Sequence, residues 1–210
     1  MDLILKYFPD LSVGQIEKFR LLENIYSEWN SRINVISRRD MDNFYERHVL
    51  HSLSLAKLID FTEDTRILDL GTGGGFPGIP LAVIFEKCRF ILADSVKKKI
   101  RVVQEAVSRL QLKNTEPANQ RAENIHDQFD FVITRATASA EKLISWTSGK
   151  FLQENRNELP NGILALKGGD LEEELQNIKS RTRVFDISSF FEEPFFRTKK
   201  IVHVGNTRNN

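Results

Sequence analysis

The 210-residue sequence predicts an α/β fold with a mostly parallel sheet. Short apolar runs, of which 67–70 and 90–93 are the clearest, alternate with segments of helical periodicity. The first run passes into a glycine-rich turn, after which Pro77 and Pro80 stand where a helix can start. An acidic residue, Asp94, closes the second run. Strand, glycine turn, helix and acid in this order are typical of a nucleotide-cofactor site.

The remaining elements follow from periodicity, with apolar residues recurring at helical spacing in the first helix. We expect helices over about 12–30, 40–60, 97–110, 139–152 and 170–180. We expect seven strands over about 65–70, 89–94, 115–120, 129–134, 163–167, 183–190 and 199–204. Residues 1–60 are therefore predicted to form a small helical extension, and residues 61–210 the core of the same compact unit.

The glycine turn indicates which cofactor is bound. Its spacing is Gly-x-Gly-x-Gly over Gly71, Gly73 and Gly75, with Asp69 in the strand end before it. The dinucleotide fingerprint requires a third glycine where this chain has Phe76. The observed pattern is that of S-adenosylmethionine (SAM) methyltransferases, although a glycine turn by itself is equally compatible with a plain loop. We expect Asp69, Gly71, Gly73 and Phe76 at the cofactor.

Asp94 is the second cofactor candidate. It lies 23 residues after Gly71, at the end of the next predicted strand. A carboxylate there can accept hydrogen bonds from both ribose hydroxyls of a bound nucleoside. The same position suits a helix N-cap for the segment that begins near Lys97, and one residue can do both. NAD and SAM enzymes share this acid, so it does not separate them.

Composition excludes several classes of protein. The chain is 40% hydrophobic and 28% charged, as is ordinary for a soluble domain, and it has no run of 18 apolar residues. The first residues do not resemble a signal peptide. With Cys88 as the single cysteine, and four scattered histidines, we expect no disulfide and no metal site. We expect a cytoplasmic monomer.

The net charge of +1 conceals an uneven distribution. Residues 87–113 contain eight basic and two acidic residues, and residues 194–210 contain four basic residues and no acid. Either segment alone is compatible with a solvated helix face. Both together, on a nucleotide-type fold, favour an RNA partner.

The chain resembles the small-subunit ribosomal RNA methyltransferase G family (RsmG, also called glucose-inhibited division protein B) over nearly its whole length. The Gly-Phe-Pro-Gly-Ile-Pro extension of the glycine loop and the Arg-His element are the most specific parts of the match. The matching segments are 34–37, 47–52, 69–81, 94–95 with the following lysines, 121–123, 134–136 and 166–168. The resemblance implies a class I methyltransferase fold. It also implies methyl transfer from SAM to N7 of a guanine in the 530-region loop of 16S ribosomal RNA, presented as RNA or as the small ribosomal subunit.

The resemblance also implies roles for individual residues. Gly71, Gly73 and Phe76 would line the methionine and ribose side of the cofactor, Ala122 and Glu123 would lie beside the adenine, and Arg135 would stand between cofactor and RNA. The residues facing the substrate, which form the catalytic set together with Arg135, would be Asn34, His48 and Lys167. Arg197 would also face the RNA, and we expect Lys97, Lys98 and Lys199 to contact its phosphates on the cofactor side of the sheet.

Several of these residues also have plain structural interpretations, and the chain departs from the family pattern in places. His48 is compatible with a helix cap or a buried histidine, Lys167 with a strand end, and Asn34 with a turn. Many members have proline at Gly74 and leucine at Phe76, which a turn and an apolar wall tolerate. Many also have aspartate at His51, so a carboxylate role there is in doubt.

Methylation at N7 requires little chemistry, since the nitrogen carries a lone pair and needs no deprotonation. Positioning and electrostatics should therefore dominate. The sequence contains neither an Asn-Pro-Pro-Tyr motif for an exocyclic amine nor a Pro-Cys pair for a pyrimidine ring. Three alternatives remain: an NAD oxidoreductase, a non-catalytic RNA-binding or ribosome-assembly protein on the same fold, and a small-molecule methyltransferase.

Overall fold

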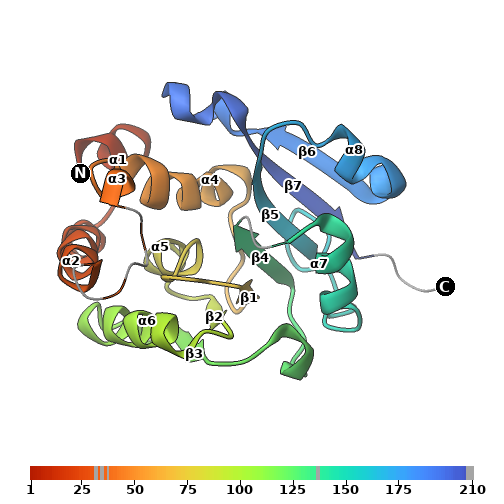
Figure 1. Cartoon of the computed structure of the whole chain (residues 1–210), viewed down its shortest axis with the longest axis horizontal. Helices are drawn as coiled ribbons and strands as arrows, with labels where there is room; N and C mark the ends of the chain where they lie inside the picture. Colours follow the sequence, from red (N-terminus) through yellow and green to blue (C-terminus); the bar gives the residue numbers. More distant parts are fainter. Residues whose placement is uncertain (31–32, 34–35, 37, 136–137, 207–210) are drawn as a thin grey trace.

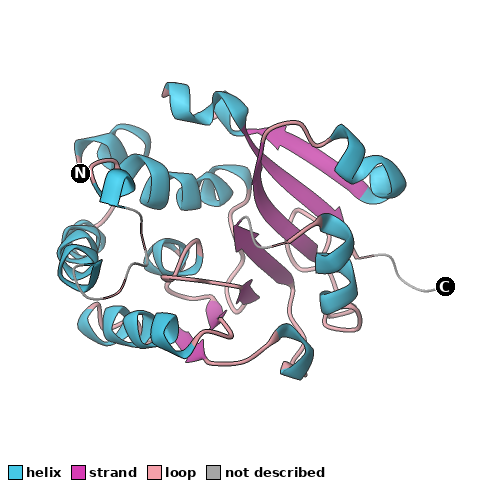
Figure 2. Ribbon diagram, in the orientation of Figure 1, coloured by secondary structure: helices cyan, strands magenta, loops and turns pink. Residues whose placement is uncertain are grey.

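The computed structural model describes residues 1–30, 33, 36, 38–135 and 138–206. These residues form a seven-stranded sheet, with helices packed around it (Figures 1 and 2). The strand order is β3-β2-β1-β4-β5-β7-β6, and β7 is antiparallel to both of its neighbours. The strands are β1 Arg66–Leu70, β2 Arg89–Ala93, β3 Thr115–Ala118, β4 Phe131–Arg135, β5 Gly162–Gly168, β6 Thr182–Asp186 and β7 Lys199–Gly205. The order reverses between β1 and β4, and such a reversal creates the crevice in which α/β sheets bind ligands.

Helices cover both faces of the sheet (Figure 1). The α-helices are α1 Asp2–Tyr7, α2 Val13–Asn30, α3 Arg38–Met41, α4 His51–Leu58, α5 Gly78–Ile84, α6 Lys97–Arg109, α7 Ala140–Thr147 and α8 Glu172–Leu175. A π-helix, η1 Tyr45–Leu50, leads into α4, and the 3₁₀ helices are η2 Ala122–Asn124, η3 Gln176–Arg181, η4 Ile187–Ser189 and η5 Pro194–Thr198. One face packs against α4, α5 and α6, and the other against η2, α7 and α8.

Alternate side chains of each central strand point to opposite faces of the sheet, where they join two separate hydrophobic cores. In β5, Leu164 and Leu166 belong to the core under α4 and α5, whereas Ile163 and Ala165 belong to the core under α7. Because both faces are covered, the central strands β1, β4 and β5 read as mostly apolar runs, which is how the sequence indicated them.

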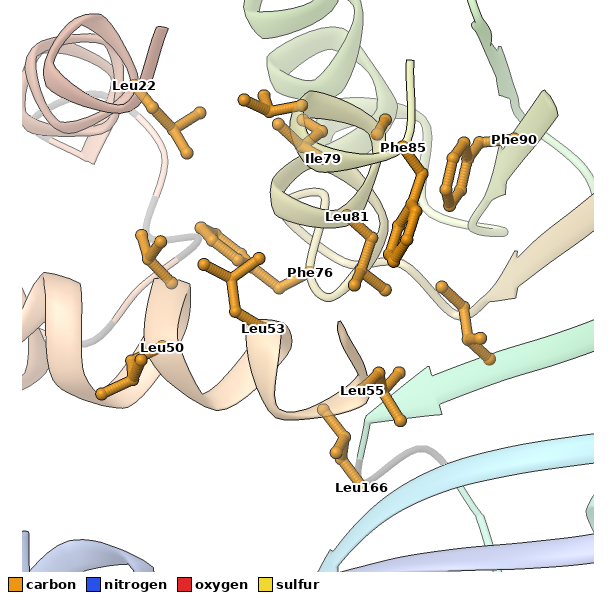
Figure 3. Close-up of a cluster of buried hydrophobic side chains, with 14 of the residues drawn as sticks. Leu22, Leu50, Leu53, Leu55, Phe76, Ile79, Leu81, Phe85, Phe90 and Leu166 are labelled. Carbon is orange, nitrogen blue, oxygen red and sulfur yellow. The ribbon is translucent and has the colours of Figure 1, made fainter. Parts of the chain in front are cut away.

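The N-terminal helices share the first of these cores. Leu22 of α2 and Leu50 and Leu53, at the junction of η1 and α4, converge with Phe76 and Ile79 of the segment after β1 (Figure 3). All five side chains are at most 2% exposed to solvent. Residues 1–60 therefore complete the core beside the glycine loop.

Several helix boundaries differ from expectation. The helix predicted over 40–60 is divided into α3, η1 and α4, and the one predicted over 139–152 ends at Thr147, before Gly149 with its φ of +75°. The segment 170–180 is one turn of α-helix followed by a 3₁₀ helix, and the strand predicted over 183–190 ends at Asp186. Helix α1 was not predicted from the sequence. Within the described part of the chain, no helix is long and apolar enough to cross a membrane.

Candidate active site

The glycine loop between β1 and α5 presents bare main chain at the carboxyl edge of the sheet. Gly73 has a φ of +59° and Gly75 a φ of +98°. At Gly75, an added Cβ would lie 2.4 Å from Ile79 Cδ1, so the loop has no room for a side chain there. At Gly73 the nearest atom to an added Cβ is 4.0 Å away, so only the backbone conformation and the open space in front of the loop require glycine. Tyr26 of α2 donates a hydrogen bond to the Gly74 carbonyl and ties the loop to the N-terminal helices.

Asp69 supports the loop from beneath. Its Oδ2 accepts hydrogen bonds from Thr72 Oγ1 at 2.6 Å and from the Gly78 amide at 2.8 Å, so one carboxylate oxygen joins the loop to the start of α5. Burial raises the pKa of Asp69 to about 7. The side chain is fully buried and is absent from the pocket wall described below. Asp69, expected at the cofactor, thus lies one layer behind the wall.

Asp94 follows β2, and its carboxylate accepts hydrogen bonds from two main-chain amides. Its Oδ2 accepts from the Gly73 amide at 3.0 Å and its Oδ1 from the Val96 amide at 2.8 Å, while Lys99 Nζ lies 3.8 Å from Oδ2. The bond from Val96 forms an Asx turn just before α6. The N-cap of α6 is Val96, so the prediction that Asp94 caps this helix is wrong. The carboxylate also lines the pocket, and its two oxygens retain lone pairs for further donors.

A pocket of about 620 Å³ opens beside these two acids. Most of the residues expected at the cofactor line it: Gly71, Gly73, Phe76, Asp94, Ala122, Glu123 and Arg135. The wall also contains residues that were not expected there: Leu70, Thr72, Gly74, Ala93, Ser95, Val96, Lys99, Gln120, Arg121 and Trp146. All but Trp146 lie within two residues of predicted positions in the sequence. Trp146 belongs to α7 and reaches the pocket because the fold places that helix beside η2.

These residues fit SAM. The volume of the pocket is within the range of roughly 300–1,000 Å³ that is typical of small-molecule sites. Bare glycine backbone, a carboxylate at the end of the second strand, and a one-turn helix carrying Ala122 and Glu123 surround one space. The Asp94 carboxylate suits ribose hydroxyls, since they are donors that need acceptors.

Arg135, at the end of β4, lines the pocket and contacts Phe76, Arg47 and His48. Its guanidinium carbon lies 5.1 Å from the centre of the Phe76 ring, its Nη1 donates to the Arg47 carbonyl at 3.3 Å, and its Nη2 lies 3.1 Å from His48 Nδ1. Burial lowers the pKa of Arg135 to about 10, and burial together with the charge of Arg135 lowers the pKa of His48 to about 3. His48 was expected to face the substrate. In the structure its Nδ1 atom lies next to the Arg135 guanidinium.

The aromatic ring of Phe195 lies between η1 and the start of β7, close to two cations and to His51. The Phe195 ring has Arg47 Cζ at 5.6 Å and Lys199 Nζ at 4.9 Å from its centre, and its centre is 5.6 Å from that of His51. Burial lowers the pKa of His51 to about 3, so this histidine is neutral in the folded protein at neutral pH.

The expected RNA-binding cations lie on the cofactor side. Lys199 pairs in register with Gly168, the last residue of β5, so β7 begins at the edge where the parallel strands end. Arg197, two residues earlier, is exposed. Lys97 and Lys98 are exposed in the first turn of α6, which starts at the same edge, just after β2.

Lys167 and Asn34 were also expected to face the substrate. Lys167 of β5 donates to Glu174 Oε1 at 2.6 Å and to the Ala138 carbonyl at 2.7 Å, and its side chain is only 10% exposed. Glu174 also accepts from the Ala140 amide, so the pair fastens the start of α7. Lys167 is thus engaged within the protein and does not line the pocket. Asn34 lies outside the described residues.

Solved structures with a similar fold include SAM-dependent methyltransferases. A SAM-dependent O-methyltransferase from Thermotoga maritima aligns with 81% of this chain and 71% of its own chain, with a TM-score of 0.61 and 13% identity. At this identity the likeness shows the fold alone, a class I methyltransferase sheet.

Sequence relatives are much closer. A ribosomal RNA small subunit methyltransferase G from Flavobacterium johnsoniae is 50% identical over 97% of both chains. One from Phocaeicola vulgatus is 51% identical over 97% of this chain and 98% of its own. The model of the family described as rRNA small subunit methyltransferase G matches residues 15–199. With this extent of match, and with the pocket intact, the chain belongs to the rRNA small subunit methyltransferase G family.

Proposed function

We propose that this protein transfers a methyl group from SAM to N7 of a guanine in the 530-region loop of 16S ribosomal RNA. The observation that supports the proposal is that the chain matches this family over nearly its full length, while its glycine loop, Asp94, Ala122, Glu123 and Arg135 line one pocket. The cofactor is SAM, which supplies an electrophilic methyl group when bound.

The residues of the chain then have separate tasks. The glycine loop and Asp94 would hold the cofactor, and Ala122 and Glu123 would flank its adenine. Arg135 would orient the guanine through O6, the acceptor beside N7. As the N7–methyl bond forms and the sulfur–methyl bond breaks, no proton leaves the guanine, so no general base is needed. The pKa values of His48 and His51, both about 3, fit this chemistry because such histidines are poor bases.

The RNA would lie across the edge that carries Lys97, Lys98, Arg197 and Lys199. Contacts from these cations to phosphates give affinity without sequence choice, so the choice of guanine rests with the pocket mouth. We further propose that the protein acts as a monomer, because a single chain supplies both the cofactor pocket and this basic edge. A cytoplasmic location fits the single cysteine, which leaves no internal disulfide.

The test is a methyl-transfer assay with isotopically labelled SAM. Deproteinised 16S RNA and assembled small subunits, both from cells lacking this protein, serve as substrates, and mass spectrometry of nuclease fragments locates the product. We expect a single 7-methylguanosine in the 530-region loop. RNA binding without methyl transfer to either substrate would overturn the proposal in favour of a non-catalytic assembly protein, and methylation at another atom would overturn the chemistry.

A further inference from the structure

The contact between Arg135 and His48 determines where the imidazole carries its proton. A guanidinium has only donors, so at 3.1 Å from Arg135 Nη2 the Nδ1 atom of His48 must accept. An imidazole that accepts at Nδ1 is neutral, and its remaining proton is on Nε2. The ring also has little freedom to turn away, because its centre lies 5.3 Å from that of Phe76 and 6.2 Å from that of Phe44.

The π-helix η1 brings two acceptors to the same guanidinium. Arg47 offers its main-chain carbonyl to Nη1 and His48 offers Nδ1 to Nη2, so adjacent residues hold both terminal nitrogens. The Phe76 ring provides a third contact, through the guanidinium carbon. π-Helical turns are rare and occur frequently at functional sites. Here the turn fixes the orientation of one arginine at the mouth of the cofactor pocket.

We propose that His48 is a positioning residue that acts through Arg135, holding the guanidinium in the orientation needed for the target guanine. This inference rests on the proposed function, and it assigns His48 to the arginine instead of to the RNA. The low pKa of His48 is consistent with this role, because a charged imidazole would lose its acceptor and repel the arginine.

A competing role is open to the other ring nitrogen. His48 Nε2 is buried and has no hydrogen-bond partner among the described residues. If that N–H contacted the RNA directly, His48 would act without Arg135. The two roles use opposite ends of the ring, and they can therefore be separated by substitution.

Asparagine and glutamine form a matched pair for this purpose. His48→Asn keeps an acceptor at the position of Nδ1 and removes the Nε2 end, whereas His48→Gln places its amide near Nε2 and removes the Nδ1 acceptor. His48→Phe keeps the ring packed between Phe44 and Phe76 and removes both nitrogens. We expect His48→Phe and His48→Gln to lower kcat by about tenfold or more, the scale for a misplaced positioning group, with the SAM dissociation constant within about threefold of the parent. His48→Asn should recover part of the lost kcat.

A double-mutant cycle with Arg135→Ala tests the coupling. If His48 acts through Arg135, adding His48→Gln to Arg135→Ala should change kcat by less than about twofold. Rescue by glutamine instead of asparagine, or independent effects in the cycle, would overturn the proposal and favour a direct contact with RNA.

A measurement without RNA separates this inference from the proposed function. Nitrogen-15 NMR of the labelled protein at pH 6 to 8 should show His48 neutral and protonated at Nε2. An imidazolium, or a proton on Nδ1, would overturn the inference even in an active enzyme. A parent protein that fails to methylate RNA but shows this tautomer would instead refute the proposed function and leave the contact with Arg135 intact. If the variants do not fold, the NMR spectrum of the parent protein still shows whether His48 has the tautomer that the contact with Arg135 requires.

Discussion

Gly73 combines a positive φ with open space in front of it, where the cofactor would lie. We predict that Gly73→Val abolishes SAM binding, because the branched side chain would enter the pocket and disfavour the loop conformation. Isothermal calorimetry with SAM measures the effect. Gly149→Val is the matched control, since Gly149 also has a positive φ with nothing within 4 Å of an added Cβ, but does not line this pocket. The control should lose stability and keep SAM affinity; equal SAM binding by both variants would contradict the assignment of the loop.

Asp94 is expected to contribute to affinity directly. Asp94→Ala removes the acceptor for the ribose hydroxyls as well as the bond to the Gly73 amide. We predict that SAM binding weakens by about 1–3 kcal/mol, the usual cost of losing a charge-assisted hydrogen bond. The affinity is compared with that of Asp94→Asn, which keeps one acceptor and should fall between parent and alanine. A change in melting temperature with unchanged SAM affinity would mean that Asp94 serves only the turn before α6.

The buried His51 should make the free energy of unfolding depend on pH. Its pKa is lowered from 6.5 to about 3 on folding, so between these values the unfolded chain binds more protons, and the free energy of unfolding falls as the pH decreases from 6.5. Asp69 works in the opposite direction, because its pKa is raised from 3.8 to about 7.

We predict that His51→Phe makes the loss of stability between pH 6.5 and 4 shallower by up to about 1.4 kcal/mol per pH unit, the slope for one proton. Urea unfolding of parent and variant across this pH range measures it. His126→Ala, at an exposed histidine, is the control and should leave the slope as it is. Parallel curves for parent and His51→Phe would show that His51 is not neutral in the fold.

The pocket residues could be predicted from the sequence where chemistry demands a residue type at a set position along a strand or loop. This holds for Gly71, Gly73 and Asp94. Asp69 was expected at the cofactor too, but spacing along the chain cannot distinguish a carboxylate that faces the ligand from one that faces the loop beneath it. The partners of Lys167 and His48 lie 7 and 87 residues away in sequence, and no local pattern reports such contacts.

At the scale of elements, the basic start of β7 and the short helix η5 before it should bind RNA. We predict that Arg197→Ala with Lys199→Ala weakens RNA binding, lowers the log–log salt slope by up to about one unit per lost contact, and leaves SAM affinity unchanged. The methylated guanine should stay the same, because phosphate contacts carry no base choice. Binding titrations at several salt concentrations measure the slope.

The control for this surface lies at the opposite edge of the sheet. Lys87→Ala with Arg89→Ala also removes two cations, both exposed and paired on the surface with Glu63 and Asp64, beside the start of β2. That variant should keep both affinity and salt slope. If the two double variants behaved alike, the RNA surface would have to lie elsewhere.

Strands proved easier to predict than helices for a physical reason. A central strand buried on both faces is a short, mostly apolar run with sharp ends, as in β1, β4 and β5. All seven predicted strands are present, but the part-exposed edge strand β6 is shorter than expected. The helices over 40–60 and 170–180 have apolar periodicity, but their backbone geometry is decided by tertiary contacts. In η1 the chain adopts a π-helix, and Arg47 and His48 of this segment contact Arg135.

At the scale of the whole molecule, the N-terminal helices cannot be removed without exposing the core beside the cofactor loop. Leu22, Ile25, Leu50 and Leu53 are fully buried in the cluster that also holds Leu81. Burial of four such side chains is worth roughly 6–12 kcal/mol, which approaches the total stability of about 5–15 kcal/mol of an ordinary domain. Tyr26 in addition donates to the Gly74 carbonyl, so the loop itself loses a support.

We therefore predict that the fragment 61–210, expressed alone, is insoluble or unfolds without a cooperative transition, and does not bind SAM. Chemical unfolding, together with calorimetry of SAM binding, tests this on whatever soluble fraction is obtained. Co-expression with residues 1–60 as a separate chain is the control and should restore soluble protein, because the lost contacts are side-chain packing between the two parts and need no covalent link. A fragment that unfolds cooperatively and binds SAM like the full chain would instead make residues 61–210 an independent domain, with the first 60 residues an accessory to RNA binding alone.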